Sequence, residues 1–296
     1  MRWSITRKQA GMLIREFLSK EAQFSKRLII KAKSEQGQIR VNGISQTVRY
    51  ILQEEDILTV QLPREKVAPY MKKEAAPLQI MYEDEDLLIV DKPSGLATIP
   101  SREDPDTSIA NRLLYYYEIH SLPYTIHIVT RLDRETSGLV LVAKHQYCHS
   151  ILAAMQKRQE IFRTYRAIAA GVIEQTDFTI NQPIGRKEGS IIERAVIQNG
   201  KQAITHGKVL NRYKTCTFLE LQLETGRTHQ IRVHLAHNGN PLLGDDLYQG
   251  DTPHINRQAL HCHKLYFVHP FTKQELEITS TLPLDMKHLL DTQDSR

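Results

Sequence analysis

The pattern of apolar and polar positions divides the chain into a front with two helical segments, a stretch without periodicity and a strand-rich remainder. Between residues 11 and 33, apolar side chains recur at helical spacing in two short segments, and Ser25 is placed to cap the second. An Asn-Gly pair ends the alternating segment Ile39-Arg40-Val41-Asn42-Gly43, which favours a tight hairpin. Further short strands are expected over residues 50–52 and 57–60.

Apolar periodicity lapses over residues 63–77, where Lys, Glu, Ala and Pro dominate. Such a composition is typical of a linker between folded units. The sequence therefore predicts a small N-terminal module over residues 1–62, this linker, and a larger domain over residues 78–296.

Short strands dominate the larger domain. An uninterrupted apolar run over residues 139–143 has the length and β-branched content of a buried strand. Short strands with few helices between them are compatible with the α+β fold class. We expect further strands over residues 87–90, 162–169, 219–223 and 260–265, and helices over residues 111–117 and 149–158.

A dense polar loop leads directly into the strand at residues 139–143. It reads Arg131-Leu132-Asp133-Arg134-Glu135-Thr136-Ser137-Gly138. A loop held against a buried strand is a rigid mount for a reactive side chain, and the arginines beside Asp133 favour its charged form. The same residue types also gather in ordinary solvated turns. The loop alone therefore leaves both readings open.

The composition is that of a water-soluble globular protein, with 41% hydrophobic and 25% charged residues. No run approaches the ~20 apolar residues of a membrane span, and the N-terminus lacks the apolar segment of a signal peptide. Cys148, Cys216 and Cys262 are far apart and odd in number, so they provide no disulfide framework. We expect a cytoplasmic protein without a membrane partner.

Positive charge is concentrated at the front of the chain. Residues 1–75 carry 15 Lys and Arg against 8 Asp and Glu, whereas the rest carries 24 against 26. This distribution is typical of a basic module that delivers a near-neutral enzyme to a polyanion. The alternative is an ordinary solvated charged helix. The candidate phosphate contacts are Lys26, Arg27 and Lys31 of the second helical segment, and Arg40 of the hairpin.

The polar loop and the residue after it, Arg131 to Leu139, resemble the signature of the RluA family of large-subunit pseudouridine synthases. The resemblance implies that Asp133 is catalytic and that Arg131 takes the place of the base that leaves its stack. It also implies that the ring of Tyr165, in the strand over residues 162–169, stacks beneath that base. One departure is Thr130, where the family usually has histidine.

A second motif of the family follows as Gly226-Arg227-Thr228-His229-Gln230-Ile231-Arg232-Val233-His234. The resemblance implies that its first arginine, Arg227, pairs with the catalytic aspartate. Thr228 is a plausible N-cap for a helix that ends at Asn238-Gly239.

The front of the chain resembles, more loosely, the small RNA-binding module named for ribosomal protein S-four. The residues that carry this likeness are Phe24 to Lys26, Gly37 to Gly43 and Asp56 to Val60. The combination points to the RluD-like branch of the family. The fold that the family implies is α+β, a long mixed, mostly antiparallel sheet with flanking helices and a cleft across its middle.

The histidines of the second half do not form a metal-ligand pattern. His229, His234 and His237 lack the spacing of an adequate ligand set, and His261 and His263 fit a structural role on one strand. Converting uridine to pseudouridine breaks the N1–C1′ bond and rejoins the uracil through C5 without redox change or energy input. We therefore expect neither a metal nor a cofactor.

The sequence thus favours an isomerase that makes pseudouridine in RNA. A carboxylate can stabilise or trap the positive charge that builds at C1′, as in retaining glycosidases, with Arg227 as its compensating charge. Whether Asp133 attacks C1′ or initiates elimination at C2′ is left open. A non-catalytic RNA-binding or ribosome-assembly factor is a second reading, and a metal-dependent RNA hydrolase fails for lack of ligands.

The expected partner is structured RNA. Large-subunit ribosomal RNA is favoured because the basic front would act as a second binding surface on a flexible tether. A transfer RNA stem-loop is the alternative. No protein partner is implied, and a monomer is expected.

Overall fold

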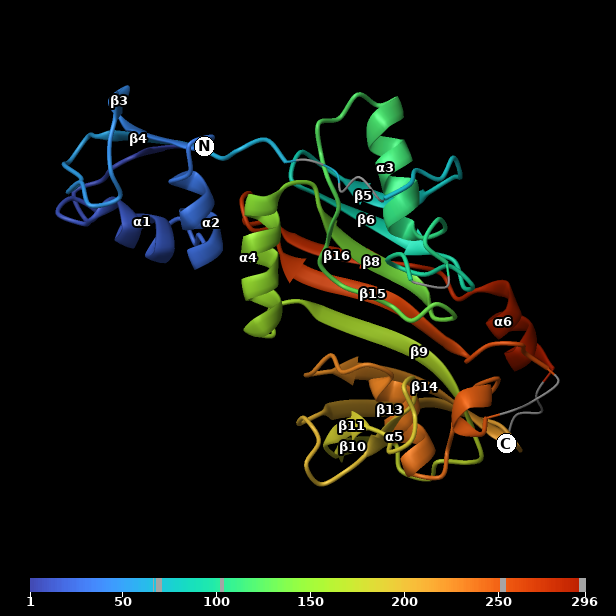
Figure 1. Ribbon diagram of the computed structural model, residues 1–296. Helices are drawn as coiled ribbons and strands as arrows, with labels where there is room; N and C mark the ends of the chain where they lie inside the picture. Colours follow the sequence, from blue (N-terminus) through green and yellow to red (C-terminus); the bar gives the residue numbers. More distant parts are fainter. Residues whose placement is uncertain (66, 68–70, 102–103, 251–253, 293–296) are drawn as a thin grey trace.

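The computed structural model describes residues 1–65, 67, 71–101, 104–250 and 254–292, which form two larger sheets and one two-stranded sheet, with helices around them (Figure 1). A four-stranded sheet belongs to the N-terminal module, and a ten-stranded sheet forms the body of the larger domain. The N-terminal module lies to one side of helix α4 (Gln146–Lys157), whereas the large sheet lies on the other (Figure 1).

The N-terminal module joins an antiparallel sheet to two short helices, as its sequence pattern predicts. The Ser25 hydroxyl accepts a hydrogen bond from the Leu28 amide at 3.2 Å, which confirms the predicted cap. Asn42 and Gly43 have φ of 50° and 83°, the left-handed values that a two-residue hairpin turn requires. Its elements are β1 (Arg2–Ser4), α1 (Ile14–Lys20), α2 (Lys26–Ala32), β2 (Gln38–Val41), β3 (Ile44–Ser45) and β4 (Ile57–Gln61).

The prediction of a strand over residues 50–52 is wrong. Only an isolated bridge joins Ile51 to Leu13. The Tyr50 carbonyl accepts from the Ile14 amide, and the Leu52 amide donates to the Met12 carbonyl. The segment therefore bonds to the chain that enters α1 and does not join the sheet.

The large sheet has the order β10-β13-β14-β9-β15-β8-β6-β5, with β16 on β15 and β7 on β8. All of its pairs are antiparallel except β15 with β8, so the expected mixed, mostly antiparallel sheet is confirmed. A two-stranded sheet lies beside it, formed by β11 (Ile184–Arg186) and β12 (Arg194–Val196). The strands of the large sheet are β5 (Gln79–Glu83), β6 (Leu87–Lys92), β7 (His127–Ile128), β8 (Ser137–Ala143), β9 (Phe162–Ala170), β10 (Asp177–Asn181), β13 (Ile204–Arg212), β14 (Cys216–Leu223), β15 (Leu260–Val268) and β16 (Glu275–Thr279).

Strand β8 is buried along its whole length, as its uninterrupted apolar sequence predicts. Gly138 near its start has φ +112° and lies against β15. A Cβ atom at Gly138 would come within 2.3 Å of the Cys262 carbonyl oxygen, so only glycine allows the two strands to approach this closely. The loop that precedes β8 is thereby fixed in the middle of the sheet.

The predicted helices over residues 111–117 and 149–158 are present as α3 (Ile109–Ile119) and α4. Helix α5 (Gln230–His237) begins within the second signature, and its N-cap is His229, not Thr228, with no side-chain cap. The remaining helical elements are the 3₁₀ turn η1 (Asp246–Tyr248) and α6 (Leu284–Asp291). Within the described ranges, no helix has the length and apolar character that crossing a bilayer requires.

The described residues of 63–77 form neither helix nor strand, yet they follow the surface of the larger domain closely. Glu74 pairs with Arg112 at 2.9 Å, and Lys72 pairs with Asp106 at 2.6 Å. The three cysteines are buried and unbonded to one another.

Candidate active site

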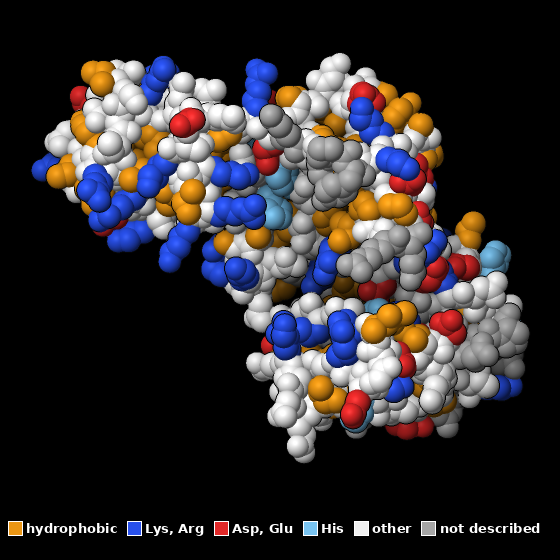
Figure 2. All heavy atoms as spheres, in the orientation of Figure 1, with side chains coloured by type: hydrophobic (Ala, Val, Ile, Leu, Met, Phe, Trp, Pro, Cys, Tyr) orange, Lys and Arg blue, Asp and Glu red, His pale blue; other side chains and the backbone are white. Residues whose placement is uncertain are grey.

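A cavity of about 560 Å³ opens at the middle of the large sheet. Figure 2 shows a groove between two parts of the domain, which in the same orientation in Figure 1 carry α3 and α5. Its walls come from the loop before β8, from β9, and from the segment that leads into α5. The polar residues that face it include Arg131, Asp133, Arg163, Tyr165, Arg227, His229 and Arg232.

The backbone on both sides of Asp133 is fixed. Thr98 donates its hydroxyl to the Leu132 carbonyl at 2.8 Å and accepts from the Leu132 amide at 3.1 Å. Lys92 donates to the Arg134 carbonyl at 2.8 Å. The Asp133 side chain keeps 30% of its surface exposed, toward the cavity. A half-exposed carboxylate is thus mounted on a loop that has little freedom to move.

Lys92 lies beneath this loop and has no exposed surface. Its ammonium also donates to the carbonyls of Pro93 at 2.9 Å and Leu96 at 2.7 Å. Burial lowers the pKa of Lys92 to about 7, although the negative charges of Glu135 and Asp133 act in the opposite direction. One buried amine therefore ties the 93–96 turn to the loop that carries Asp133.

The arginine beside Asp133 is Arg232, from α5. Its Nη1 lies 3.5 Å from Oδ2 of Asp133. Its Nε and Nη2 donate to the two carboxylate oxygens of Asp245, at 2.7 and 2.8 Å, and its guanidinium lies over the Tyr248 ring. This bidentate pair orients the guanidinium, so that its free edge is turned to Asp133.

His229 approaches the same oxygen of Asp133. Its Nε2 lies 3.9 Å from Oδ2, and its Nδ1 lies 2.8 Å from the Tyr248 hydroxyl. Burial lowers the pKa of His229, with the Asp133 charge opposing that shift. The backbone of His229 is left-handed, with φ 57°, a conformation that non-glycine residues adopt at a cost and that occurs often at functional sites.

Arg227 does not contact Asp133 in this structure, in contrast to the pairing that the resemblance implies. Arg227 lines the cavity, but it is exposed and donates its Nε to the Gln202 carbonyl at 2.9 Å. It precedes the left-handed turn at His229, and Arg232 follows that turn. The change in chain direction leaves Arg227 at the rim and brings Arg232 inside.

Tyr165 and Arg131 both line the cavity. Tyr165 is buried on β9, and burial raises its pKa, so its phenol stays protonated. Arg131 is exposed at the rim, two residues from Asp133. Thr130, the departure from the family pattern, is buried and accepts from the Leu141 amide at 2.9 Å, which anchors the loop to β8.

Arg163 is a further cavity residue that the sequence analysis did not single out. It lies two positions before Tyr165 on β9 and therefore on the same strand face. Its guanidinium reaches Gly226, where a Cβ atom would come within 2.9 Å of Nη2. Within the described ranges no carboxylate pairs with it. The period-two spacing of strands could have identified it.

The predicted RNA-contacting residues of the module divide into two groups. Lys26 and Arg27 are exposed at the start of α2, and Arg40 is exposed on β2. Lys31 is half-buried and donates to the Gln146 side chain in α4 at 2.6 Å. Lys31 therefore serves the contact between the module and the larger domain.

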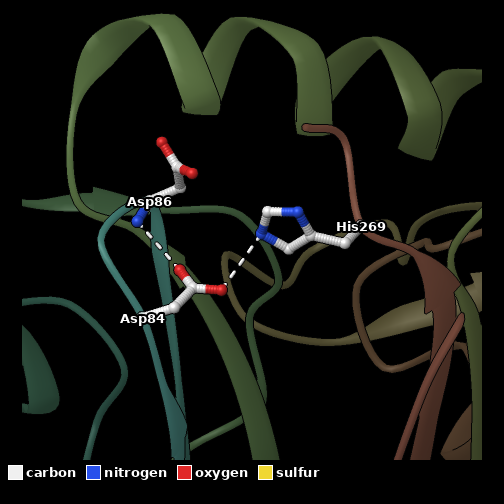
Figure 3. A group of neighbouring side chains, drawn as sticks. All are labelled: Asp84, Asp86 and His269. Carbon is white, nitrogen blue, oxygen red and sulfur yellow. Dashed lines mark hydrogen bonds and ion pairs between the residues drawn. The ribbon is translucent and has the colours of Figure 1, made fainter. Parts of the chain in front are cut away.

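Asp84, Asp86 and His269 lie close enough together to be considered as a metal site (Figure 3). Nδ1 of His269 accepts hydrogen bonds from the backbone amides of Phe271 and Thr272, at 3.3 and 3.0 Å. The ring hydrogen must then sit on Nε2, which lies 3.1 Å from Asp84 Oδ2 and points toward it. A protonated nitrogen cannot ligate a cation, so this donor set does not fit a metal.

The histidines on β15 are packed into the sheet. Nδ1 of His261 lies 2.9 Å from the Ser137 hydroxyl, and burial lowers the pKa of His261 to about 4. Nδ1 of His263 lies 2.5 Å from the Ser280 carbonyl. Both side chains connect neighbouring strands.

The long mixed sheet and its central cleft define the pseudouridine synthase fold. The human RNA pseudouridylate synthase domain containing 4 protein has the same fold, with a TM-score of 0.59 and 23% identity over 72% of this chain and 92% of that one. The family model for RNA pseudouridylate synthase matches residues 86–237. The chain therefore belongs to the RNA pseudouridine synthases and is an isomerase.

Two curated relatives illustrate the likeness. An uncharacterized RNA pseudouridine synthase of Bacillus subtilis, YjbO, is 45% identical over 279 residues, which cover 94% of this chain and 98% of the relative. The ribosomal large subunit pseudouridine synthase D of Escherichia coli is 39% identical over 230 residues, which cover 73% and 70%.

Proposed function

We propose that Asp133 is the catalytic carboxylate of this synthase and that Arg232 is the cation that balances and orients it. The observation that carries the proposal is the 3.5 Å contact between the two inside the cavity, on a loop held by Thr98 and Lys92. The volume of the cavity falls within the range of about 300–1,000 Å³ in which proteins bind small ligands and nucleosides.

In this reaction the N1–C1′ bond of the target uridine breaks and a C5–C1′ bond forms, while the proton at C5 is lost and one is gained at N1. Asp133 acts on the sugar, either by attack at C1′ or by removal of the C2′ proton. Arg232 balances the aspartate charge within the cavity. Neither step transfers electrons to an outside acceptor.

The uridine must leave its stack before it can react, at a cost of about a few kcal/mol. In the proposal the buried Tyr165 ring supports the extruded base, and Arg131, exposed at the rim, fills the gap in the RNA. Arg163 and Arg227 bind phosphates at the mouth of the cavity.

The proposed substrate is large-subunit ribosomal RNA, and we propose that the protein belongs to the RluD-like branch. Support comes from the named function of the Escherichia coli relative and from the surplus positive charge of residues 1–75. A transfer RNA stem-loop is the alternative substrate. Lys26, Arg27 and Arg40 would contact phosphates in either case.

The deciding experiment maps pseudouridines in total RNA from cells with the wild-type protein, without it, and with Asp133→Asn. The proposal expects one or a few large-subunit positions to be lost in the deletion and not restored by the variant. Loss at a transfer RNA position would select the alternative substrate. If Asp133→Asn restores the modification to within tenfold of wild type, Asp133 is not the catalytic group. Restored ribosome assembly without modification would favour an assembly role.

A further inference from the structure

The N-terminal module is packed onto the larger domain through aromatic side chains. Tyr147 in α4 meets the rings of Phe24 and Trp3, with centroids 4.8 and 6.4 Å apart, and on its other side meets Phe271 at 5.4 Å. Its hydroxyl donates to the Ala22 carbonyl at 2.9 Å. Buried aromatic contacts of this kind fix the angle between the two units.

Polar contacts surround this aromatic cluster. Lys31 donates to Gln146 at 2.6 Å, and the Ser25 amide donates to the Ser150 hydroxyl at 3.2 Å. Glu65, just after the module, lies 2.9 Å from His127 of the larger domain. The flexible tether expected from the sequence is therefore not what the structure shows, because the module and α4 form one continuous packed unit.

A second cavity, of about 390 Å³, lies at the seam between them. Lys20 and Ser25 border it from the module, and Ser150 and Arg158 border it from α4. Three exposed basic residues are close in sequence to these positions: Lys26 and Arg27 follow Ser25, and Lys157 precedes Arg158. Arg158 itself is paired with the exposed Glu160 at 2.6 Å. Lysine and arginine side chains line the edge of the module and continue toward the groove (Figure 2).

Helix α4 borders both cavities. Ser150, Ala154 and Arg158 line the seam, whereas Gln156, close to its C-terminal end, lines the cavity that contains Asp133. The helix has 12 residues and is therefore about 18 Å long. Helix α4 therefore connects the active cavity to the seam.

We propose that the seam is a phosphate-binding surface, and that the double-stranded RNA beside the target loop lies on it at a fixed distance from Asp133. The inference rests on the proposed function, which it extends to the form of the substrate. Double-stranded RNA is recognised mainly through its shape and phosphates, so a rigid basic surface suits it better than base-specific contacts would. The docked module selects targets by the position of their flanking stem.

A tethered module and a docked module respond differently when the contact between the module and α4 is lost. A tether acts through effective concentration, which does not depend on the contact between the two units. A docked module contributes through preorganisation, which is lost once the contact is broken. Tyr147→Ala removes the central ring, and Tyr147→Phe keeps the ring and removes only the hydrogen bond to Ala22.

The experiment uses the full chain and two RNAs with the same target loop, one with a minimal stem and one with an extended stem. For Tyr147→Ala we expect kcat/KM on the extended RNA to fall at least about tenfold and that on the short hairpin to stay within about twofold of wild type. Tyr147→Phe should resemble wild type. Equal effects of Tyr147→Ala on both RNAs would overturn the inference.

Charge variants test the phosphate contacts separately. Lys20→Gln and Arg158→Gln, at two residues that border the seam, should each reduce the salt dependence of extended-RNA binding by about one unit of slope. Lys287→Gln is the matched control, because this exposed lysine lies on α6, across the domain from the module (Figure 1). Unchanged slopes for the two seam variants would contradict a phosphate site.

A covalent lock addresses the case in which Tyr147→Ala unfolds the module. Ser25→Cys with Ser150→Cys places two thiols on neighbouring residues, because the Ser25 backbone amide donates to the Ser150 hydroxyl, and the three native cysteines are buried. If the module acts in its docked position, the oxidised, disulfide-linked form and the reduced form should have equal activity on the extended RNA. A module that must move would lose activity on oxidation. If wild type modifies neither RNA, the proposed function fails, whatever the seam does.

Discussion

At the scale of single residues, the site depends on how Arg232 is held before it meets Asp133. Asp245 is fully buried and accepts hydrogen bonds from Nε and Nη2 of the guanidinium. These two bonds fix the orientation of the guanidinium, and its Nη1 lies beside Asp133. The 3.5 Å separation from Asp133 is longer than a hydrogen bond of about 2.7–3.2 Å. The interaction in the free enzyme is therefore one of charge, with the carboxylate still available to the substrate.

This arrangement predicts different consequences for the two arginines of the second signature. Arg232→Ala should lower kcat/KM by about 10²–10³, which is about 3–4 kcal/mol of transition-state stabilisation, because it removes the charge that balances and orients Asp133. Arg227→Ala should stay within about tenfold, with the loss mainly in RNA affinity, since Arg227 lies at the rim. Thermal unfolding of each variant controls for stability. The opposite ranking would contradict the assignment.

The buried amine of Lys92 predicts a pH effect on stability. Its folded pKa is about 7 and its ordinary value is 10.5, so between these values the unfolded chain binds more protons. Stability due to Lys92 therefore rises with pH across this window, by at most about 1.4 kcal/mol per unit, and is lost as pH falls to 7.

Urea unfolding of wild type and Lys92→Met at pH 7, 8 and 9 measures this effect. The difference between the two proteins cancels every other titrating group. As pH rises, we expect the free energy of unfolding of wild type to increase relative to that of Lys92→Met. A constant difference over these three values would show that burial does not depress the lysine pKa.

The sequence identified Asp133, Tyr165 and Arg131 as residues of one site, and all three line the cavity. The family motif carries this information because it spans the loop and its strand. The motif contains two arginines, and the choice between them depends on the left-handed turn at His229, which no hydrophobic pattern encodes. Arg163 was missed because it belongs to no motif, and its spacing of two from Tyr165 is the feature of the sequence that places it on the same strand face.

At the scale of elements, strand positions followed from the sequence because apolar runs and alternation are local properties. Strand β1, with three residues, is too short to show a period. The parallel pairing of β15 with β8 joins residues 124 positions apart, as at His261 and Ser137, and its register depends on tertiary packing. The segment over residues 50–52 looked like a strand but bonds to a loop.

The close approach of these two strands predicts that Gly138→Ala is strongly destabilising. The new Cβ would meet the backbone of Cys262 at 2.3 Å, and neither strand can shift without moving the Asp133 loop. We expect a loss of about 3 kcal/mol or more in urea unfolding, with loss of activity. Gly189→Ala is the control: it also has positive φ, 77°, but open space, so its cost should be about 1 kcal/mol. Equal costs would show that strand contact is unimportant.

At the scale of the whole molecule, the two sheets share one apolar core cluster that runs from Ile5 in the module to Phe267 in the larger domain. Composition marked the boundary near residues 63–77 but contained no sign that the module is docked. Tyr147 reads as an ordinary helical tyrosine, and its partners Trp3 and Phe24 lie more than a hundred positions away. Contacts at such separations cannot be read from periodicity.

The shared core predicts that the larger domain is not independent of the module. Removing residues 1–62 uncovers Tyr147 in α4, and exposing such a side chain costs about 1.5–3 kcal/mol before the lost polar contacts are counted. The truncated chain should unfold at lower temperature than the full chain and aggregate more readily. Tyr147→Ser in the truncated chain should reduce the aggregation, because it removes the exposed ring. Differential scanning calorimetry measures the stability and light scattering measures the aggregation, and activity on the short hairpin reports whether the cavity remains folded.

A truncated domain as stable and as soluble as the full chain would mean that the contacts around Tyr147 contribute nothing to folding. The module would then behave as the separate unit that the composition first suggested.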